Sequence, residues 1–234
     1  MAVTTSQSPA WLPSARLRTA AGMVGPVLFL VVLALLDRLD GSIDVSAHEL
    51  GRAGWLMQLD FFVFGLLVLA LASVVPRGLR PGRLARVGTG LLCVWGLGPL
   101  LATFTLDWQN GGPPTTWHGT LHFLGFLLVA LAPIPTLFVF AWLFRRDERW
   151  RGFQWYSLIT GIALVAVVFG PPTSEGDAYP IWTGPASMLE LALACAWLEL
   201  VAIRLWRLSG RRRLEEDRGS RRGALSGPAI IEQA

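Results

Sequence analysis

The sequence predicts an all-α integral membrane protein, a bundle of six transmembrane helices with both termini in the cytoplasm. Charged residues make up 15% of the 234-residue chain, against about 25% in a typical soluble domain. Six long stretches carry almost no charge, and the segments between them are alternately rich and poor in arginine. These three observations indicate a multi-pass protein of the plasma membrane, with the lipid bilayer as its first partner.

The predicted spans are six stretches of 18 to 23 residues: 19–36, 54–75, 87–106, 121–143, 153–170 and 185–203. About 20 apolar residues in a helix cross a hydrocarbon core of about 30 Å. Asp60, Glu190 and Glu199 are the only charged residues inside the stretches. Because lipid admits only helices or closed barrels, and no alternating strand pattern is present, we predict helices.

The first stretch resembles a signal peptide only in part. Eighteen residues precede it, and it ends without a small-x-small cleavage site, so we predict an uncleaved first span. The membrane domain is therefore expected at 19–206, after a cytoplasmic tail at 1–18. The Arg-rich segment 207–234 is expected to be a disordered cytoplasmic tail.

Arginine supplies all 20 basic residues, because the chain contains no lysine. A Schiff-base cofactor and a lysine-dependent phosphate loop are thereby excluded. Segments 1–18, 76–86, 144–152 and 204–234 hold 2, 4, 4 and 8 arginines, whereas 37–53, 107–120 and 171–184 hold 2, 0 and 0. This positive-inside pattern orients the bundle. It also explains the high pI without a nucleic-acid partner.

Glycines and prolines predict how two of the spans pack and bend. The third stretch contains Gly88, Gly90, Gly96 and Gly98, a series typical of close helix packing. Prolines predict kinks in the third stretch, at Pro99, and in the fourth, at Pro133 and Pro135.

Ionisable residues concentrate in the outer third of the predicted bundle. Asp60 lies about 9 Å and Glu190 about 8 Å below the outer start of their spans, at 1.5 Å per residue. The outer loops and span ends add further candidates, namely His48, Glu49, Asp107, His118 and His122. Glu199 lies deeper and on the opposite helix face from Glu190, so we expect it to meet Arg204 or Arg207. An ionisable residue within the membrane is a functional candidate.

His118 and His122 share one helical face, because four residues separate them. They could hold a single zinc ion with Asp107 as a further ligand, while Glu49 activates water for a metal-dependent hydrolase. The glutamate of an HExxH motif is absent. The alternative is that both histidines make structural hydrogen bonds between helices. Haem fits poorly, because residues one turn apart cannot bind opposite sides of its iron.

A short loop with two glycines and two prolines separates Asp107 from His118. It predicts that the third and fourth spans are antiparallel neighbours. We therefore expect an Asp107 carboxylate oxygen within hydrogen-bonding reach of His118 or His122, directly or through one water. In the alternative, Asp107 caps backbone amides of its own loop.

These residues and their flanks resemble the bacterial membrane family catalogued as domain of unknown function 998. The similarity spans Gly22–Arg207 and is carried by Glu49–Gly54, Phe61–Gly65, Phe104–Asp107 and Thr116–His122. The resemblance implies a six-span bundle and little chemistry. Glu49, Asp107, His118 and His122 match family positions, whereas His48, Gln58 and Asp60 depart from the family pattern.

Two functions of different class follow from the sequence. The leading hypothesis is a protein that binds or senses a lipid, a small amphiphile or a membrane partner at the outer leaflet, because polar groups cluster there without a complete catalytic motif. The alternative is the metal-dependent hydrolase that uses His118, His122, Asp107 and Glu49. A transporter is less favoured, because the chain has no repeats and no charged pair at the midplane.

Overall fold

The computed structural model describes residues 13–41, 44–107, 113–170 and 184–225, with side chains of the last helix described as far as Gly210. All regular secondary structure in these ranges is helical. The elements in chain order are α1 (Pro13–Asp40), η1 (Ser46–Leu50), α2 (Gly54–Ala72), α3 (Val75–Gly78), α4 (Arg83–Ala102), α5 (Trp117–Leu131), α6 (Pro133–Arg145), η2 (Glu148–Trp150), α7 (Phe153–Phe169) and α8 (Pro185–Leu225).

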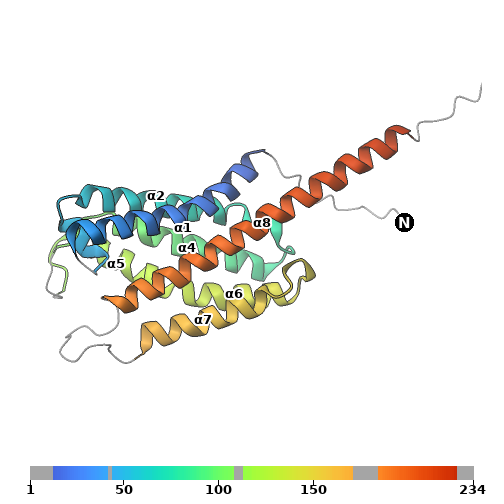
Figure 1. Ribbon diagram of the computed structural model, residues 1–234. Coiled ribbons are helices and arrows are strands. Elements are labelled where there is room, and N and C mark those ends of the chain that lie inside the picture. The colour runs from blue at the N-terminus through green and yellow to red at the C-terminus, as the bar shows by residue number, and fades with distance from the viewer. Residues whose placement is uncertain (1–12, 42–43, 108–112, 171–183, 226–234) are drawn as a thin grey trace, which may run out of the picture.

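Six apolar helical segments lie side by side and confirm the predicted membrane bundle (Figure 1). Five are long and apolar enough to cross a membrane: Ser14–Asp40, Gly54–Gly78, Arg83–Ala102, Trp117–Arg145 and Pro185–Gly210. The sixth, α7, is a shorter apolar helix of 17 residues. Each segment overlaps one predicted span, because the absence of charge over about 20 residues identifies a span by itself.

The helices follow one another up and down around the bundle. Neighbouring pairs are α1 with α2, α2 with α4, α4 with both α5 and α6, α6 with α7, α7 with α8, and α8 with α1. The start of α1 and the end of α8 lie at the same end of the bundle (Figure 1). We call it the arginine-rich end, defined by residues 73–82 and 146–152. The opposite, histidine end is defined by residues 44–53, 103–107 and 113–118.

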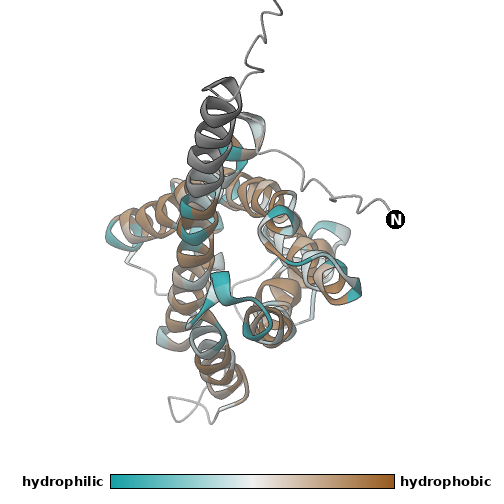
Figure 2. Cartoon of the chain, turned by 90° about the vertical axis from the view of Figure 1, so that its right-hand side faces the viewer, coloured by the Kyte–Doolittle hydropathy of each residue, from teal (hydrophilic) through white to brown (hydrophobic). Residues whose placement is uncertain are grey.

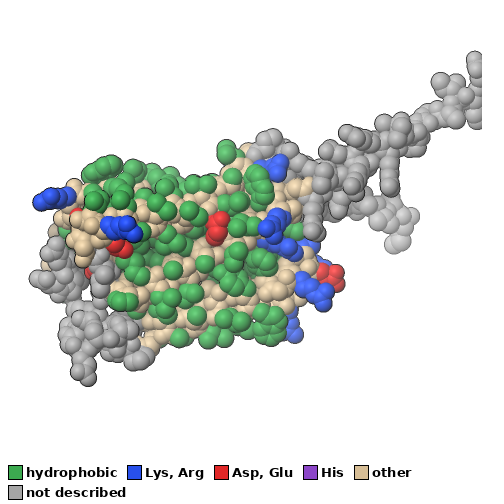
Figure 3. Space-filling model, in the orientation of Figure 1, with side chains coloured by type: hydrophobic (Ala, Val, Ile, Leu, Met, Phe, Trp, Pro, Cys, Tyr) green, Lys and Arg blue, Asp and Glu red, His purple; other side chains and the backbone are tan. Residues whose placement is uncertain are grey.

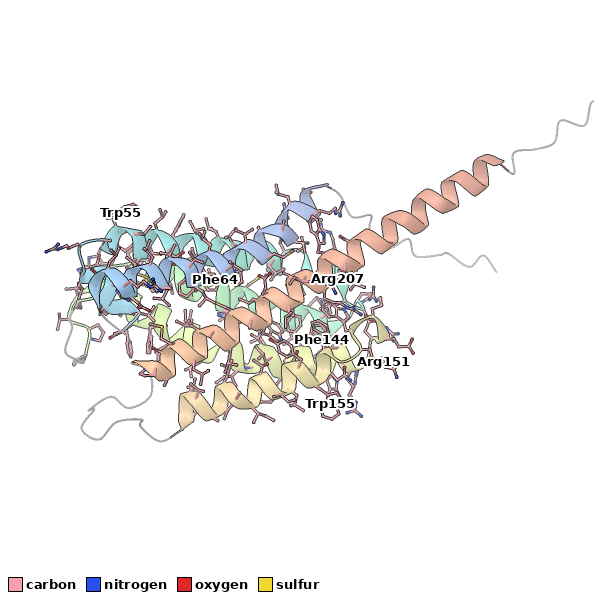
Figure 4. All side chains as sticks on the ribbon, viewed as in Figure 1. Trp55, Phe64, Phe144, Arg151, Trp155 and Arg207 are labelled. Carbon is pink, nitrogen blue, oxygen red and sulfur yellow. The ribbon has the colours of Figure 1, made fainter. Side chains whose placement is uncertain are left out.

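The surface of the bundle agrees with a lipid environment. Hydrophobic residues make up most of the helical ribbon, and hydrophilic residues are confined to short stretches (Figure 2). Charged side chains concentrate at both ends in the space-filling view, around a broad hydrophobic band (Figure 3). Exposed tryptophans occur near both ends, and Figure 4 labels Trp55 at one and Trp155 at the other. That the histidine end faces outward stays a prediction from the arginine distribution.

Small residues bring α4 and α5 into backbone contact. A Cβ added at Gly125 would lie 2.4 Å from the Ala102 amide nitrogen, and one at Gly98 would lie 2.9 Å from that of Val129. Gly88 and Gly96 also face neighbouring side chains, whereas Gly90 has nothing within 4 Å. Close packing is thus confirmed at three of the four glycines of the predicted series.

Proline divides the fourth span. Helix α5 ends at Leu131 and α6 begins at Pro133, because proline lacks the N–H that would continue the ladder. The sequence predicted a kink at this position. The third span differs from its prediction, since α4 ends at Ala102 rather than at residue 106. The freed carbonyl groups of residues 104 and 105 bind the two histidines described below.

Aromatic side chains fill the middle of the bundle. The Trp95 and Trp197 rings lie 6.1 Å apart, and Phe140 meets Trp197 edge-on at 5.3 Å. The Trp197 indole N–H donates to Ser157 Oγ at 2.9 Å, with both residues fully buried. Helix α8 then continues to Leu225, into the segment 207–234 that was expected to be a disordered tail. Residues 226–234 lie outside the described part of the chain.

Candidate functional site

The histidine end holds all three histidines of the chain in a layer of polar contacts. His48 comes from η1, and His118 and His122 come from the first two turns of α5. Residues 103–107 follow the end of α4 and belong to no helix. The Phe104 and Thr105 carbonyl groups therefore remain available to side chains.

His122 is buried at the centre of this layer, with 2% of its side chain exposed. Its Nδ1–H donates to the Phe104 carbonyl oxygen at 2.8 Å. Because a carbonyl only accepts, this contact fixes the proton on Nδ1 of the neutral ring. The Nε2 atom then accepts from the Ser46 hydroxyl at 3.1 Å. The imidazole thus ties α5 to residues on both sides of it.

Glu49 lies beside His122, with its Oε2 atom 3.5 Å from His122 Nδ1. The same oxygen accepts the Leu106 backbone N–H at 3.0 Å, whereas Oε1 has no hydrogen-bond partner among the described residues. Burial raises the pKa of Glu49 to about 8, against the lowering effect of the Leu106 hydrogen bond. Glu49 thus joins η1 to residue 106 and lies beside the His122 ring. Its assignment as a general base stays a prediction from the sequence.

Asp107 approaches His118 as the loop between them predicts. The distance from Asp107 Oδ1 to His118 Nδ1 is 3.4 Å, although the Nδ1–H itself donates to the Thr105 carbonyl at 2.9 Å. The alternative role is also present, since Asp107 Oδ2 accepts the backbone N–H groups of Thr115 at 2.7 Å and Thr116 at 2.8 Å. Asp107 therefore combines both expected roles.

The N-terminus of α5 is capped twice. Thr116 Oγ accepts the Gly119 backbone N–H at 3.1 Å and donates to Asp107 Oδ1. The Thr116 hydroxyl is the main cause of the lowered pKa of Asp107, and the two backbone N–H groups act in the same direction. A negative charge at this position is favoured by the helix dipole. Asp107 thus stays ionised and holds the start of α5 in place.

His48 forms a separate contact that the sequence did not predict. Its side chain is fully buried, and its Nε2 lies 2.7 Å from Asp37 Oδ1 at the end of α1. Its Nδ1 lies 3.5 Å from Asp40 Oδ2. An imidazole between two carboxylates joins η1 to α1. The only sequence signal was the pair of aspartates three residues apart, on one face of the first predicted helix.

The predicted metal ligands do not assemble into a ligand set in the described residues. No group of three or more His, Cys, Asp or Glu side chains there has the arrangement to hold a metal ion. Nδ1 of both His118 and His122 binds a backbone carbonyl, and Ser46 binds the second nitrogen of His122. These contacts are the structural hydrogen bonds that the sequence allowed as the alternative.

The three acidic residues within the spans each have a carboxylate oxygen that is not paired by the described residues. Asp60 and Glu190 are buried, and each has one carboxylate oxygen without a hydrogen-bond partner among the described residues. The same holds for Glu199, so its expected pairing with Arg204 or Arg207 is not seen. Arg204 donates instead to the Arg149 carbonyl oxygen through Nε at 3.0 Å. That contact ties α8 to η2 at the arginine-rich end.

A cavity of about 60 Å³ lies directly below the histidine layer, among α1, α2, α4, α5 and α8. Four phenylalanine rings contribute to its wall: Phe29, Phe61, Phe64 and Phe126. Its polar lining residues are Asp44, Ser46, Ser187 and Glu190. Ser46 belongs to the cavity and also binds His122, so the cavity and the histidine layer form one continuous site. The sequence feature that pointed to this wall was the pair Phe61 and Phe64, one helical turn apart.

Comparison with curated proteins and with solved structures gives no match. A family model matches residues 20–204, which cover all six apolar helical segments almost completely and include every residue of the site described above. The matched range agrees with the resemblance carried by the Asp107 and His118–His122 block. The chain therefore belongs to the family described as Protein of unknown function (DUF998).

Proposed function

We propose that this chain binds a lipid or small amphiphile at the histidine end of the bundle, in the outer leaflet of the plasma membrane. The observation that carries the proposal is the cavity below the histidine layer. Its wall is mainly apolar, and its polar groups come from residues 44–46 and from the first two turns of α8. A pocket with an apolar wall and a few polar groups is the usual form of a small-ligand site.

The site separates the two parts of an amphiphile. Ser46 and Ser187 place hydroxyl groups at the part of the cavity nearest the histidine end, while Phe64 and Val129 line it further along their helices. The polar face of a head group would meet the hydroxyls, and its apolar part would meet the rings and aliphatic side chains. The histidine layer would hold Ser46 in position through its contact with His122.

Photolabelling tests the proposal. The full chain in nanodiscs of phosphatidylcholine is labelled with three hexadecyl amphiphiles that each carry a diazirine near the head. The heads are trimethylammonium, hydroxyl and carboxylate. We expect at least one probe to label peptides that contain Phe61, Phe64 or Phe126, with saturation at low concentration.

Ala130→Phe is designed to fill the cavity, because Ala130 lines it and is 1% exposed. Ala192→Phe is the matched control, since Ala192 faces outward from α8. Saturable labelling is expected to be lost in the first variant and kept in the second. Equal labelling of both variants, or labelling confined to outward residues such as Ile159, would overturn the proposal.

A further inference from the structure

Glu190 places in the cavity a buried carboxylate oxygen that has no partner among the described residues. It lines the cavity from the second turn of α8 and is 5% exposed, and its Oε1 atom has no hydrogen-bond partner among the described residues. A buried carboxylate without a partner is costly in an apolar environment. A ligand that brings a positive charge or a hydrogen-bond donor to this oxygen would remove the cost.

The charged residues that line the cavity are both acidic. Asp44 is the second acidic residue on the wall, and the described lining residues include no arginine and no histidine. The imidazole that contacts the lining, that of His122 through Ser46, uses both nitrogens in contacts with Phe104 and Ser46. An anionic head would therefore face the Glu190 carboxylate, with no basic side chain among the described lining residues.

The phenylalanine rings favour the same kind of head. Phe29 stacks on Phe64 with ring centroids 4.7 Å apart, and Phe61 lies 6.0 Å from Phe29. Phe64 is labelled in Figure 4, where it lies within the bundle and not at either end. Aromatic faces attract ammonium groups, and quaternary ammonium groups are commonly held among several rings.

The size of the cavity matches a head group. A buried water needs roughly 10–15 Å³ of such space, so about 60 Å³ accommodates about four to six water-sized groups. An amine or a trimethylammonium group with its first methylene falls in this range. The rest of an alkyl chain would extend towards the surrounding bilayer.

From these observations we infer that the cavity selects a cationic amphiphile, with an amine or quaternary ammonium head held by the Glu190 carboxylate among the phenylalanine rings. This inference rests on the proposed function, because it names the class of ligand for the same cavity. The inference predicts that the cavity prefers a cationic head group over a neutral or anionic one, in addition to binding an amphiphile.

The three photolabelling probes measure that selectivity. In the wild-type chain, the trimethylammonium probe is expected to half-saturate labelling of the cavity peptides at a concentration about tenfold or more below that of the hydroxyl probe. Glu190→Gln should abolish this difference, because it removes the charge and keeps the shape. Glu199→Gln is the matched control, since Glu199 lies on the same helix and does not line the cavity. It should keep the preference.

A competition experiment needs no variant. Tetramethylammonium chloride should displace the trimethylammonium probe from the wild-type chain, and its neutral analogue neopentyl alcohol should not. Equal labelling by all three heads, blocked by Ala130→Phe, would overturn the charge selectivity and leave the proposed function intact. A preference that survives in Glu190→Gln would also overturn it. Failure of every probe to label the cavity would overturn the proposed function itself.

Discussion

A side chain at Gly119 would collide with Asp107, because a Cβ there would lie 2.1 Å from the Asp107 Oδ2 atom. The missing side chain lets the carboxylate lie over the first turn of α5. From that position it accepts the backbone N–H groups of Thr115 and Thr116 and lies 3.4 Å from His118. Gly119 is therefore part of the geometry of the histidine layer.

The first prediction concerns this contact. Gly119→Ala should destabilise the protein by about 1–3 kcal/mol, the usual cost of overpacking, because Asp107 must leave the cap. Gly90→Ala is the control, since Gly90 is also helical and has nothing within 4 Å. It should be neutral or stabilising by up to about 1 kcal/mol. Thermal unfolding in detergent measures both, and equal melting temperatures would contradict the prediction.

The second prediction is a pH dependence of stability that depends on Glu49. Its folded-state pKa of about 8 exceeds the ordinary value of 4.5, so the folded state binds the proton more tightly. The stabilisation is fully present below about pH 4.5 and is lost as the pH rises towards 8. At about 1.4 kcal/mol per pKa unit, the total effect is on the order of 3–5 kcal/mol.

Melting temperatures measured between pH 5 and pH 9 test this dependence. The wild-type value should fall across the range, and Glu49→Gln should flatten the curve because its amide does not titrate. Glu148→Gln, at an exposed position on the arginine-rich end, should leave the wild-type curve unchanged. A wild-type curve that rises with pH, or one that Glu49→Gln leaves unchanged, would contradict the prediction.

The third prediction concerns the buried hydrogen bond between Trp197 and Ser157. Ser157→Ala leaves the indole N–H without its partner at a position that is fully buried. We expect a loss of about 1–3 kcal/mol. The double variant with Trp197→Phe should cost less than the sum of the single variants, because the unpaired donor is then removed. Additive costs would argue that water already satisfies the indole.

The fourth prediction concerns the metal content of the purified protein. We expect substoichiometric zinc, equal in the wild type and in His118→Ala, because three of the four imidazole nitrogens of His118 and His122 already bind protein groups. Elemental analysis of protein prepared without chelators measures this directly. One zinc ion per chain that disappears in His118→Ala would contradict this prediction and favour the metal-dependent hydrolase.

The fifth prediction is the orientation of the bundle. In a chain with Cys93 and Cys195 replaced by alanine, Arg52→Cys should react with a membrane-impermeant maleimide on intact cells. Arg151→Cys should react only after permeabilisation, because it lies at the arginine-rich end. Both arginines are exposed, so accessibility within the protein does not separate them. The reverse pattern would place the histidine layer in the cytoplasm.

The sequence was sufficient for the membrane helices. Each span is a local property, because about 20 apolar residues without charge cross the hydrocarbon core wherever they occur in the chain. The break at Pro133 is equally local, since it follows from a missing N–H group. The approach of Asp107 to His118 was also predictable, because a short loop returns the chain to the helix beside it.

Only the tertiary structure decided which groups meet across the bundle. The contacts of His48 with Asp37, of Glu49 with Leu106, and of His122 with Ser46 each join separate elements. The early end of α4 at Ala102 is also a tertiary effect, because the Phe104 and Thr105 carbonyl groups outside the helix need donors. His122 and His118 supply these donors. The cavity arises in the same way. Its Phe29, Phe126 and Glu190 come from three helices, and hydropathy determines that a helix is buried in lipid but not which of its faces meets which neighbour.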